Sequence, residues 1–219
     1  IDGGTGNDTL TSSGTSSLTG GAGNDTFKIA AASVTADSTY KGGDGTDTLE
    51  VSSEAAIVDA DFGGMTSVEQ ITYSSTMAAT LTLGSTAAAT GVTKVTFDDT
   101  NEASLVTVGV DFTNDLEVVV SDVLHDVTAS AFTKVLTVDA GAATLAATNG
   151  IAGGTGTTDV FEFNGITNAS SISSGVTGFE KLVVNKDATS TFLLHDAFGA
   201  AEGTANFTID ASAITSTDK

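Results

Sequence analysis

The stretch Gly3-Gly4-Thr5-Gly6-Asn7-Asp8-Thr9-Leu10 recurs twice more within the first fifty residues. The later copies read Gly20-Gly21-Ala22-Gly23-Asn24-Asp25-Thr26-Phe27 and Gly42-Gly43-Asp44-Gly45-Thr46-Asp47-Thr48-Leu49. In each copy glycines precede an aspartate, and an apolar residue follows two positions after it. Glycine permits a tight turn with positive φ, and the apolar residue is suited to a short strand. The pattern therefore predicts a row of turns, each leading into a strand.

This G-G-x-G-x-D-x-U-x pattern resembles the calcium-binding nonapeptide of the RTX, or hemolysin-type, family. In that family each nonapeptide forms a turn and a strand of a β-roll, and coils stack every two motifs. Asp8 and Asp25 are 17 residues apart, so the resemblance implies that they lie on one edge. A degenerate copy at residues 14–18 has Ser16 in place of the aspartate and is expected on the opposite edge, without metal. Asp47, 22 residues after Asp25, would extend the occupied edge.

The resemblance implies two calcium ions, each held between two stacked turns, because calcium takes six to eight oxygen ligands and one turn offers about half of them. The ligands of the first ion would come from the turn of Gly3, Thr5 and Asp8 and the turn of Gly21, Gly23 and Asp25. Those of the second would come from the turn of Gly20, Ala22 and Asp25 and the turn of Gly43, Gly45 and Asp47. Asp25 would then serve both ions.

A looser copy of the motif occupies residues 153–161, with one extra residue before Asp159. The insertion displaces the carboxylate, so we expect a plain turn there, and Asp159 is the weaker candidate ligand. A longer internal repeat includes both regions. In each copy a Gly-Asp turn precedes a Gly-x-x-x-apolar-Glu-x-apolar strand, so that Glu69 follows Asp47 by 22 residues and Glu180 follows Asp159 by 21.

Short apolar-x-apolar pairs recur along the whole chain at intervals close to 22 residues. They are Phe27/Ile29, Leu49/Val51, Ile71/Tyr73, Val95/Phe97, Val118/Val120, Leu136/Val138, Phe161/Phe163, Leu182/Val184 and Phe207/Ile209. Such a regular interval is typical of a parallel β-solenoid, in which each coil buries apolar side chains against the next. We predict an all-β fold with an RTX β-roll at residues 1–52 and a β-solenoid at residues 53–219. An antiparallel β-sandwich after the β-roll is the alternative.

The composition is strongly acidic, with 7 Lys plus Arg against 28 Asp plus Glu and a formal net charge of −21. This charge argues against binding to nucleic acid or to anionic membranes, which require basic clusters. No apolar run is long enough to span a bilayer, so we predict no membrane insertion. Cysteine is absent, which excludes disulfides and thiolate metal sites, and bound metal is another source of stability. The balance of charges is that expected of a protein that binds cations.

Other polar clusters favour simpler interpretations. The pairs His125-Asp126 and His195-Asp196 lack a third ligand at a recognisable spacing, and we expect surface or turn histidines. Asp98-Asp99 with Glu102 is expected to be a solvated loop rather than a weak calcium site. The chain contains no H-E-x-x-H helix and no G-x-S-x-G elbow, so we predict no enzyme.

The Ala/Thr/Ser/Gly-rich strands resemble those of bacterial surface-layer proteins exported by type I secretion. The resemblance implies a calcium-binding structural segment, extracellular at the bacterial cell surface, that folds in calcium and self-associates or contacts other surface components. Two alternatives stay open: a segment of an RTX adhesin that binds a cell or glycan surface, and a non-catalytic part of an RTX exoenzyme. Because residue 1 lies within a repeat, we expect the chain to be a piece of a longer protein.

Overall fold

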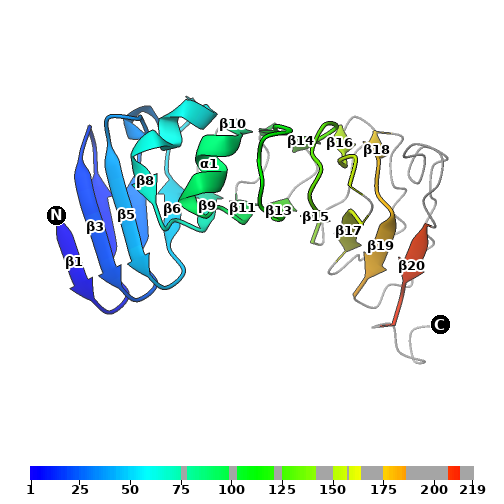
Figure 1. The fold of residues 1–219 in the computed structure, drawn as a ribbon, viewed down its shortest axis with the longest axis horizontal. Helices are drawn as coiled ribbons and strands as arrows, with labels where there is room; N and C mark the ends of the chain where they lie inside the picture. Colours follow the sequence, from blue (N-terminus) through cyan, green and yellow to red (C-terminus); the bar gives the residue numbers. More distant parts are fainter. Residues whose placement is uncertain are drawn as a thin grey trace.

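The computed structural model describes residues 1–74, 78–98, 103–120, 125–141, 150–156, 158–163, 175–185 and 207–212. Over these residues the chain winds into a parallel β-solenoid whose strands lie side by side from the N-terminal to the C-terminal end (Figure 1). All strand pairs that the described residues form are parallel, which confirms the predicted solenoid and excludes the antiparallel sandwich.

The described strands form three parallel sheets, which are the walls of the solenoid. The longest, sheet B, consists of β2 (Thr9–Ser12), β4 (Thr26–Ile29), β6 (Thr48–Val51), β9 (Gln70–Tyr73), β11 (Lys94–Phe97), β13 (Leu116–Val120), β15 (Leu136–Asp139), β17 (Val160–Phe163), β19 (Lys181–Val184) and β20 (Thr208–Asp210). Sheet A consists of β1 (Asp2–Thr5), β3 (Ser17–Ala22), β5 (Thr39–Asp44) and β8 (Met65–Thr66). Sheet C consists of β7 (Ala56–Ile57), β10 (Thr80–Leu83), β12 (Leu105–Val108), β14 (Asp126–Thr128), β16 (Ile151–Ala152) and β18 (Val176–Thr177).

The cross-section of the solenoid changes in the coil between β6 and β9. This coil contributes β8, the last strand of sheet A, and β7, the first strand of sheet C, on either side of the 3-10 turn η2 (Asp59–Gly64). A shorter 3-10 turn, η1 (Ala31–Ser33), lies between β4 and β5. The predicted boundary at residue 52 falls where this change begins, while sheet B continues across it through the pairing of β6 with β9.

The α-helix α1 (Ser85–Thr90) packs on η2 and β8 where sheet A has ended. Its start is fixed from the preceding coil, because the Asp59 carboxylate accepts hydrogen bonds from the backbone N–H groups of Gly84 and Ala87 at 2.8 Å and of Thr86 at 3.1 Å. Burial opposes ionisation of Asp59, but these bonds outweigh it and leave its pKa below the usual value. Helix α1 is thus held by a carboxylate 25 to 28 residues away.

The core is a ladder of apolar side chains that point inward from sheet B. Phe27 pairs with Leu49, and Leu49 with Ile71, so that the same face is apolar in successive coils. All three side chains are fully buried. Neighbouring strands lie about 4.8 Å apart, so each side chain packs directly on those above and below it. Burying one such side chain contributes roughly 1.5–3 kcal/mol.

The register differs from the apolar pattern at two places. Val118 of β13 pairs with Val138 rather than with Leu136, and Val138 pairs with Phe161, so the uneven intervals of 18 and 25 residues become 20 and 23. At the end of the sheet, Leu182 pairs with Ile209 rather than with Phe207. Backbone pairing and turn length set the register, whereas an apolar pair alone leaves a two-residue shift open because side chains two apart share a face.

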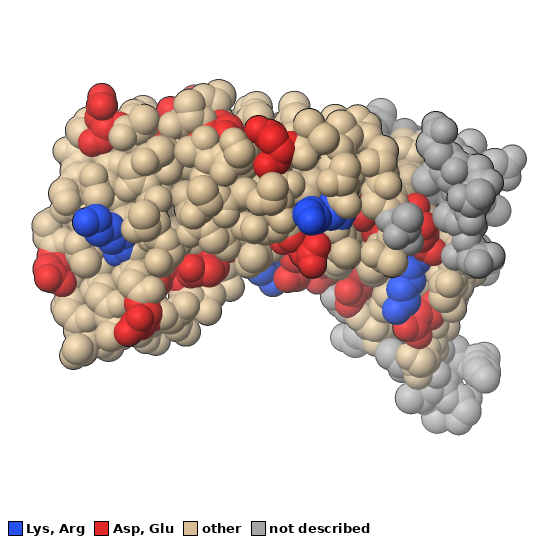
Figure 2. All heavy atoms as spheres, viewed as in Figure 1, with Lys and Arg blue, Asp and Glu red and all other residues tan. Residues whose placement is uncertain are grey.

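The outer surface carries many acidic and few basic side chains (Figure 2). On sheet B, a lysine of one strand pairs with an acid of the next: Lys28 with Glu50, Lys94 with Glu117, and Lys181 with Asp210. Among the described residues, no helix has both the length and the apolar character needed to cross a bilayer.

Candidate metal centre

Three Gly-Asp turns lie on top of one another at one edge of the solenoid, where β1, β3 and β5 lead into β2, β4 and β6 (Figure 1). The pairing places Gly4 beside Gly21 and Gly21 beside Gly43. As the spacing predicts, the three turns therefore share one edge. The turn around Ser16 joins β2 to β3 at the opposite edge, where its hydroxyl donates to the Gly14 carbonyl at 2.7 Å.

The stacked backbones come too close together for any residue except glycine. Gly21 and Gly43 have φ values of 117° and 116°, which side chains with a Cβ rarely adopt. A Cβ on either residue would lie 2.0 Å from the carbonyl oxygen of Gly4 or of Gly21, respectively, in the preceding turn. Gly23 and Gly45 repeat this arrangement over the carbonyl two residues further along the preceding turn, that of Gly6 and of Gly23, respectively. A row of carbonyl oxygens thus points along the stack.

The aspartates of these turns form a column of carboxylates. The Asp8 N–H donates to Asp25 Oδ1 at 2.8 Å, and the Asp25 N–H donates to Asp47 Oδ1 at 2.7 Å. The column ends one coil later, where the Asp47 N–H donates to Glu69 Oε2 at 2.8 Å. Each carboxylate thereby fixes the position of the aspartate in the preceding turn.

One carboxylate oxygen of each of these aspartates is buried and unpaired. Oδ2 of Asp8, of Asp25 and of Asp47 has no hydrogen-bond partner. Asp25 and Asp47 are 1% and 0% exposed, so water does not replace the missing donors. Burying an ionised oxygen without a partner is costly, and native structures rarely leave one so. Three unpaired oxygens at the same position of three stacked turns could act as cation ligands.

The remaining predicted ligands lie in the same turns. Gly3 and Gly20 lie against the unpaired oxygens, since a Cβ on them would come within 2.7 Å of Asp8 Oδ2 and 2.2 Å of Asp25 Oδ2. Thr5 pairs with Ala22, whose carbonyl accepts the Gly6 N–H at 2.7 Å. The structure therefore brings the predicted residues of the first three turns together.

An asparagine ladder, which was not predicted from the sequence, lies beside the carboxylates. Asn7 Oδ1 accepts the Asn24 N–H at 2.8 Å, and Asn24 Oδ1 accepts the Thr46 N–H at 3.0 Å. These side chains hold the turns at the spacing of the sheet. The signal was available, because asparagine precedes the aspartate in the first two copies of the motif.

The electrostatics of the column favour a cation. Burial raises the pKa of Asp47, and the nearby charges of Asp25 and Glu69 raise it further, against the lowering effect of the hydrogen bond from the Asp25 backbone. In the described part of the chain, the lysine–carboxylate ion pairs lie on sheet B and involve none of these carboxylates. No group of three or more His, Cys, Asp or Glu side chains in that part is placed to hold a metal, so an ion here would need backbone carbonyls as well.

Asp159 has a different environment. Its Oδ1 accepts the Leu136 N–H and its Oδ2 accepts the Gly154 N–H, both at 2.8 Å. The Asp159 N–H donates to Glu180 Oε2 at 2.8 Å, as the internal repeat suggests. Burial raises the pKa of both Asp159 and Glu180. With both oxygens satisfied by backbone donors, this carboxylate closes a turn.

The prediction of a surface or turn histidine is wrong for His125. Its side chain is fully buried, and its ring stacks on Phe97 with centroids 5.0 Å apart. The sequence Leu-His-Asp did not reveal that the ring continues an aromatic stack that includes Tyr73. His195 and Asp196 lie outside the described residues, as do Asp99 and Glu102, while Asp98 is exposed.

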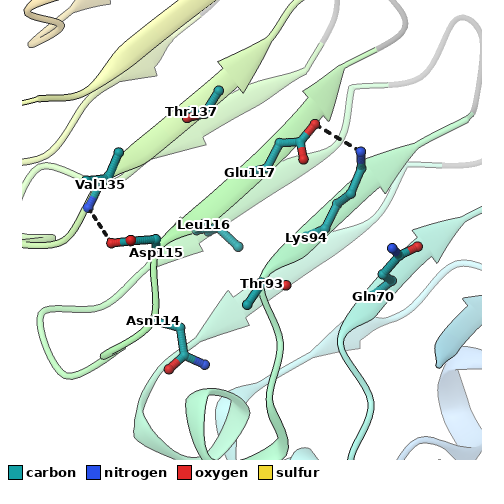
Figure 3. A pocket seen from close by; sticks show the side chains of 9 residues that line it. All are labelled: Gln70, Thr93, Lys94, Asn114, Asp115, Leu116, Glu117, Val135 and Thr137. Carbon is teal, nitrogen blue, oxygen red and sulfur yellow. Dashed lines mark hydrogen bonds and ion pairs between the residues drawn. The ribbon is translucent and has the colours of Figure 1, made fainter. Parts of the chain in front are cut away.

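A shallow groove on the outer face of sheet B offers no comparable centre (Figure 3). Its charged groups are engaged within the protein: Lys94 pairs with Glu117 at 2.9 Å, and Asp115 Oδ1 accepts the Val135 N–H at 3.1 Å. Asn114 donates to the carbonyls of Ala88 and Val92. Among the described residues, the buried carboxylate oxygens without a hydrogen-bond partner are therefore those of the Gly-Asp stack.

Comparison of the chain with protein-family models, with curated proteins and with solved structures finds no match.

Proposed function

We propose that this chain is a calcium-binding structural segment of a secreted bacterial surface-layer-type protein, resembling the RTX family in its Gly-Asp turns. The observation that supports it most directly is the set of three buried, unpaired Oδ2 atoms, at Asp8, Asp25 and Asp47. They recur at one position in stacked turns whose carbonyls point along the stack. A cation between the turns would satisfy these oxygens and neutralise the column.

Calcium is the cation that suits these ligands. Carboxylate and carbonyl oxygens are hard donors, and calcium accepts six to eight of them in flexible geometry, whereas magnesium requires a near-ideal octahedron. The chain has no cysteine, and the described turns contain no histidine, so soft-metal ligands are missing there. In our proposal Gly3, Thr5 and Asp8 contribute to the first ion, and Asp25 serves two.

Calcium binding would make folding of the chain depend on whether it is inside or outside the cell. The chain carries a net charge of −21, and its carboxylates repel one another without counter-ions. Because the sites exist only when the turns are stacked, the binding free energy adds to folding. Calcium outside the cell would then order the segment and reduce repulsion between copies, which a self-assembling surface layer requires.

The test is a calorimetric titration of the chain with calcium, with magnesium as the control ion. We expect calcium to bind at the stack and magnesium to bind much more weakly. Asp25→Asn should weaken calcium binding at least tenfold, whereas Asp98→Asn, which removes the same charge from an exposed position, should leave it unchanged. Equal losses in the two variants, or no binding by the parent chain, would contradict the proposal.

Self-assembly needs its own measurement. Sedimentation velocity in calcium, in magnesium and in chelator should show larger species only in calcium. A monomer at every calcium concentration, together with intact calcium binding, would favour the adhesin or exoenzyme alternatives instead.

A further inference from the structure

The coil that follows the third Gly-Asp turn has no such turn of its own. Lys41 pairs with Thr66 and Thr48 pairs with Gln70, so the six residues 42–47 face only the three residues 67–69. The nonapeptide pattern has ended here, and it therefore predicts no ion on this side of the third turn. Asp47 nevertheless carries the same buried, unpaired Oδ2 as Asp8 and Asp25.

A backbone carbonyl takes the place of the missing turn. A Cβ placed on Gly42 would lie 1.7 Å from the Ser67 carbonyl oxygen and 2.2 Å from Asp47 Oδ2. Because both oxygens lie this close to one point, they are no more than about 3.9 Å apart. Asp47 is 0% exposed and Oδ2 has no donor, so two electron-rich oxygens converge on a buried point beside Gly42.

The backbone at Ser67 is held in an unfavourable conformation that supports this arrangement. Its φ is 52°, the one positive value at a non-glycine residue in the described part of the chain. Such a conformation persists only where the surroundings impose it. It is the conformation in which the carbonyl lies beside Gly42.

The spacing of the two oxygens suits a calcium ion. Ligands bound at about 2.4 Å and at right angles to one another lie roughly 3.4 Å apart. The first turn shows a comparable convergence, since a Cβ on Gly3 would lie 2.7 Å from Asp8 Oδ2 and 2.8 Å from the carbonyl oxygen of Gly20 in the next turn. In both places a carboxylate oxygen of one turn meets a carbonyl of the next coil.

We propose that Asp47 Oδ2 and the Ser67 carbonyl oxygen form a third calcium site, between the last Gly-Asp turn and the coil that caps it. Glu69 acts as a positioning residue, because its Oε2 accepts the Asp47 N–H at 2.8 Å and so orients the carboxylate. This inference rests on the proposed calcium-binding function and adds to it an ion that the repeat pattern does not predict.

The turn at Asp159 provides an internal control. A Cβ on Gly153 would lie 2.1 Å from the Gly178 carbonyl, as one on Gly42 would lie 1.7 Å from that of Ser67. Asp159 Oδ2, however, accepts the Gly154 N–H and is not available to a cation. The same capping geometry therefore carries no site here.

The experiment counts bound calcium by equilibrium dialysis with radioactive calcium on the chain, on Ser67→Val and on Asp159→Asn. Valine is β-branched and disfavours positive φ, so Ser67→Val should move the carbonyl and lose one ion relative to the parent. Asp159→Asn should lose none, and Ser67→Gly, which accepts positive φ, should retain the parent number. Circular dichroism in calcium checks that each variant is folded.

The outcomes separate the two proposals. Three ions in the parent chain, with one lost in Ser67→Val, support the third site. Two ions in the parent, or an unchanged number in folded Ser67→Val, overturn the third site and leave the proposed function intact. No bound calcium overturns both. If Ser67→Val does not fold, the numbers of calcium ions bound by the parent chain and by Ser67→Gly decide. Three ions in both support the third site, and any other number in either overturns it.

Discussion

The turn that ends at Asp47 and the turn that ends at Asp159 make similar contacts with the next coil but differ in how the aspartate side chain is paired. In each, the aspartate N–H donates to a glutamate of the next coil at 2.8 Å, to Glu69 in one case and to Glu180 in the other. In each, a glycine at the start of the turn lies against a carbonyl of that coil. Asp47 Oδ2 is unpaired, whereas Asp159 Oδ2 accepts a backbone N–H.

One inserted residue accounts for the difference. Asp47 follows Gly45 by two residues, whereas Asp159 follows Gly156 by three. In the longer turn the carboxylate reaches the Gly154 N–H. Stacking also differs, because Asp47 has Asp25 in the preceding coil, while the position preceding Asp159 is filled by the Leu136 N–H. A buried carboxylate can thus serve as a structural acceptor or as a cation ligand, depending on whether the backbone supplies both donors.

The largest expected effect is that of removing calcium, and it should fall on one region. Saturating two sites a hundredfold above their Kd stabilises the fold by about 5 kcal/mol, so chelation should lower Tm by roughly 10–20 °C. Hydrogen exchange followed by mass spectrometry should show lost protection in residues 1–50 and little change in residues 150–185. Equal loosening of both regions would remove the distinction between them.

The second prediction concerns Asp25 as a shared ligand. Asp25→Ala should weaken calcium binding by roughly 100-fold and Asp8→Ala by roughly tenfold, because in the proposed arrangement Asp25 serves two ions and each tenfold step corresponds to about 1.4 kcal/mol. Calorimetric titration of both variants measures the difference. Equal losses would show that each aspartate serves one ion.

The third prediction is a change in the free energy of unfolding that has opposite signs at the two turns. In chelator, Asp47→Asn should stabilise the chain by about 1 kcal/mol, because the amide keeps an acceptor for the Asp25 N–H and directs a donor toward the Ser67 carbonyl. Asp159→Asn should destabilise it by about 1–3 kcal/mol, because both carboxylate oxygens accept backbone N–H groups. In either orientation of the amide, its NH2 group would face one of these N–H groups and leave it without an acceptor. Urea unfolding gives both values, and changes of the same sign would refute the comparison.

The smallest expected effect is a pH dependence at the second turn. Burial raises the pKa of Asp159 and Glu180, so the folded state keeps protons that the unfolded chain has already released. Their contribution to the free energy of unfolding should therefore rise as pH falls from neutrality and level off below about pH 4, at the unfolded pKa values. Glu180→Gln should reduce this rise in chelator, because the variant has no carboxyl group to titrate at this position. If the free energy of unfolding of the variant changes with pH as that of the parent chain does, other groups cause the rise.

Much of the architecture could be predicted from local pattern. The recurring apolar-x-apolar pairs predicted the strands of sheet B, and the 17- and 22-residue intervals predicted the stacking of Asp8, Asp25 and Asp47. The internal repeat indicated that Glu69 and Glu180 occupy equivalent places, and both accept the N–H of the preceding aspartate. These features succeed because a parallel stack repeats the same environment, so periodic sequence and periodic structure coincide.

Three-dimensional contacts decided what the pattern left open. The pairing of Val118 with Val138, the burial of His125 and the capping of α1 by Asp59 depend on neighbours one coil away. The same holds for the Ser67 carbonyl beside Gly42, since nothing in Met-Thr-Ser-Val-Glu marks an oxygen that faces a carboxylate.

By itself, then, the sequence determined the all-β coil, the inward apolar ladder and the row of Gly-Asp turns, because these follow from periods of side-chain polarity and from where glycine alone fits. Only the tertiary structure decided which carboxylate oxygens have donors and which do not. That distinction depends on where the backbone N–H groups of the adjacent coil point, which is fixed by register and turn length rather than by the identity of the aspartate.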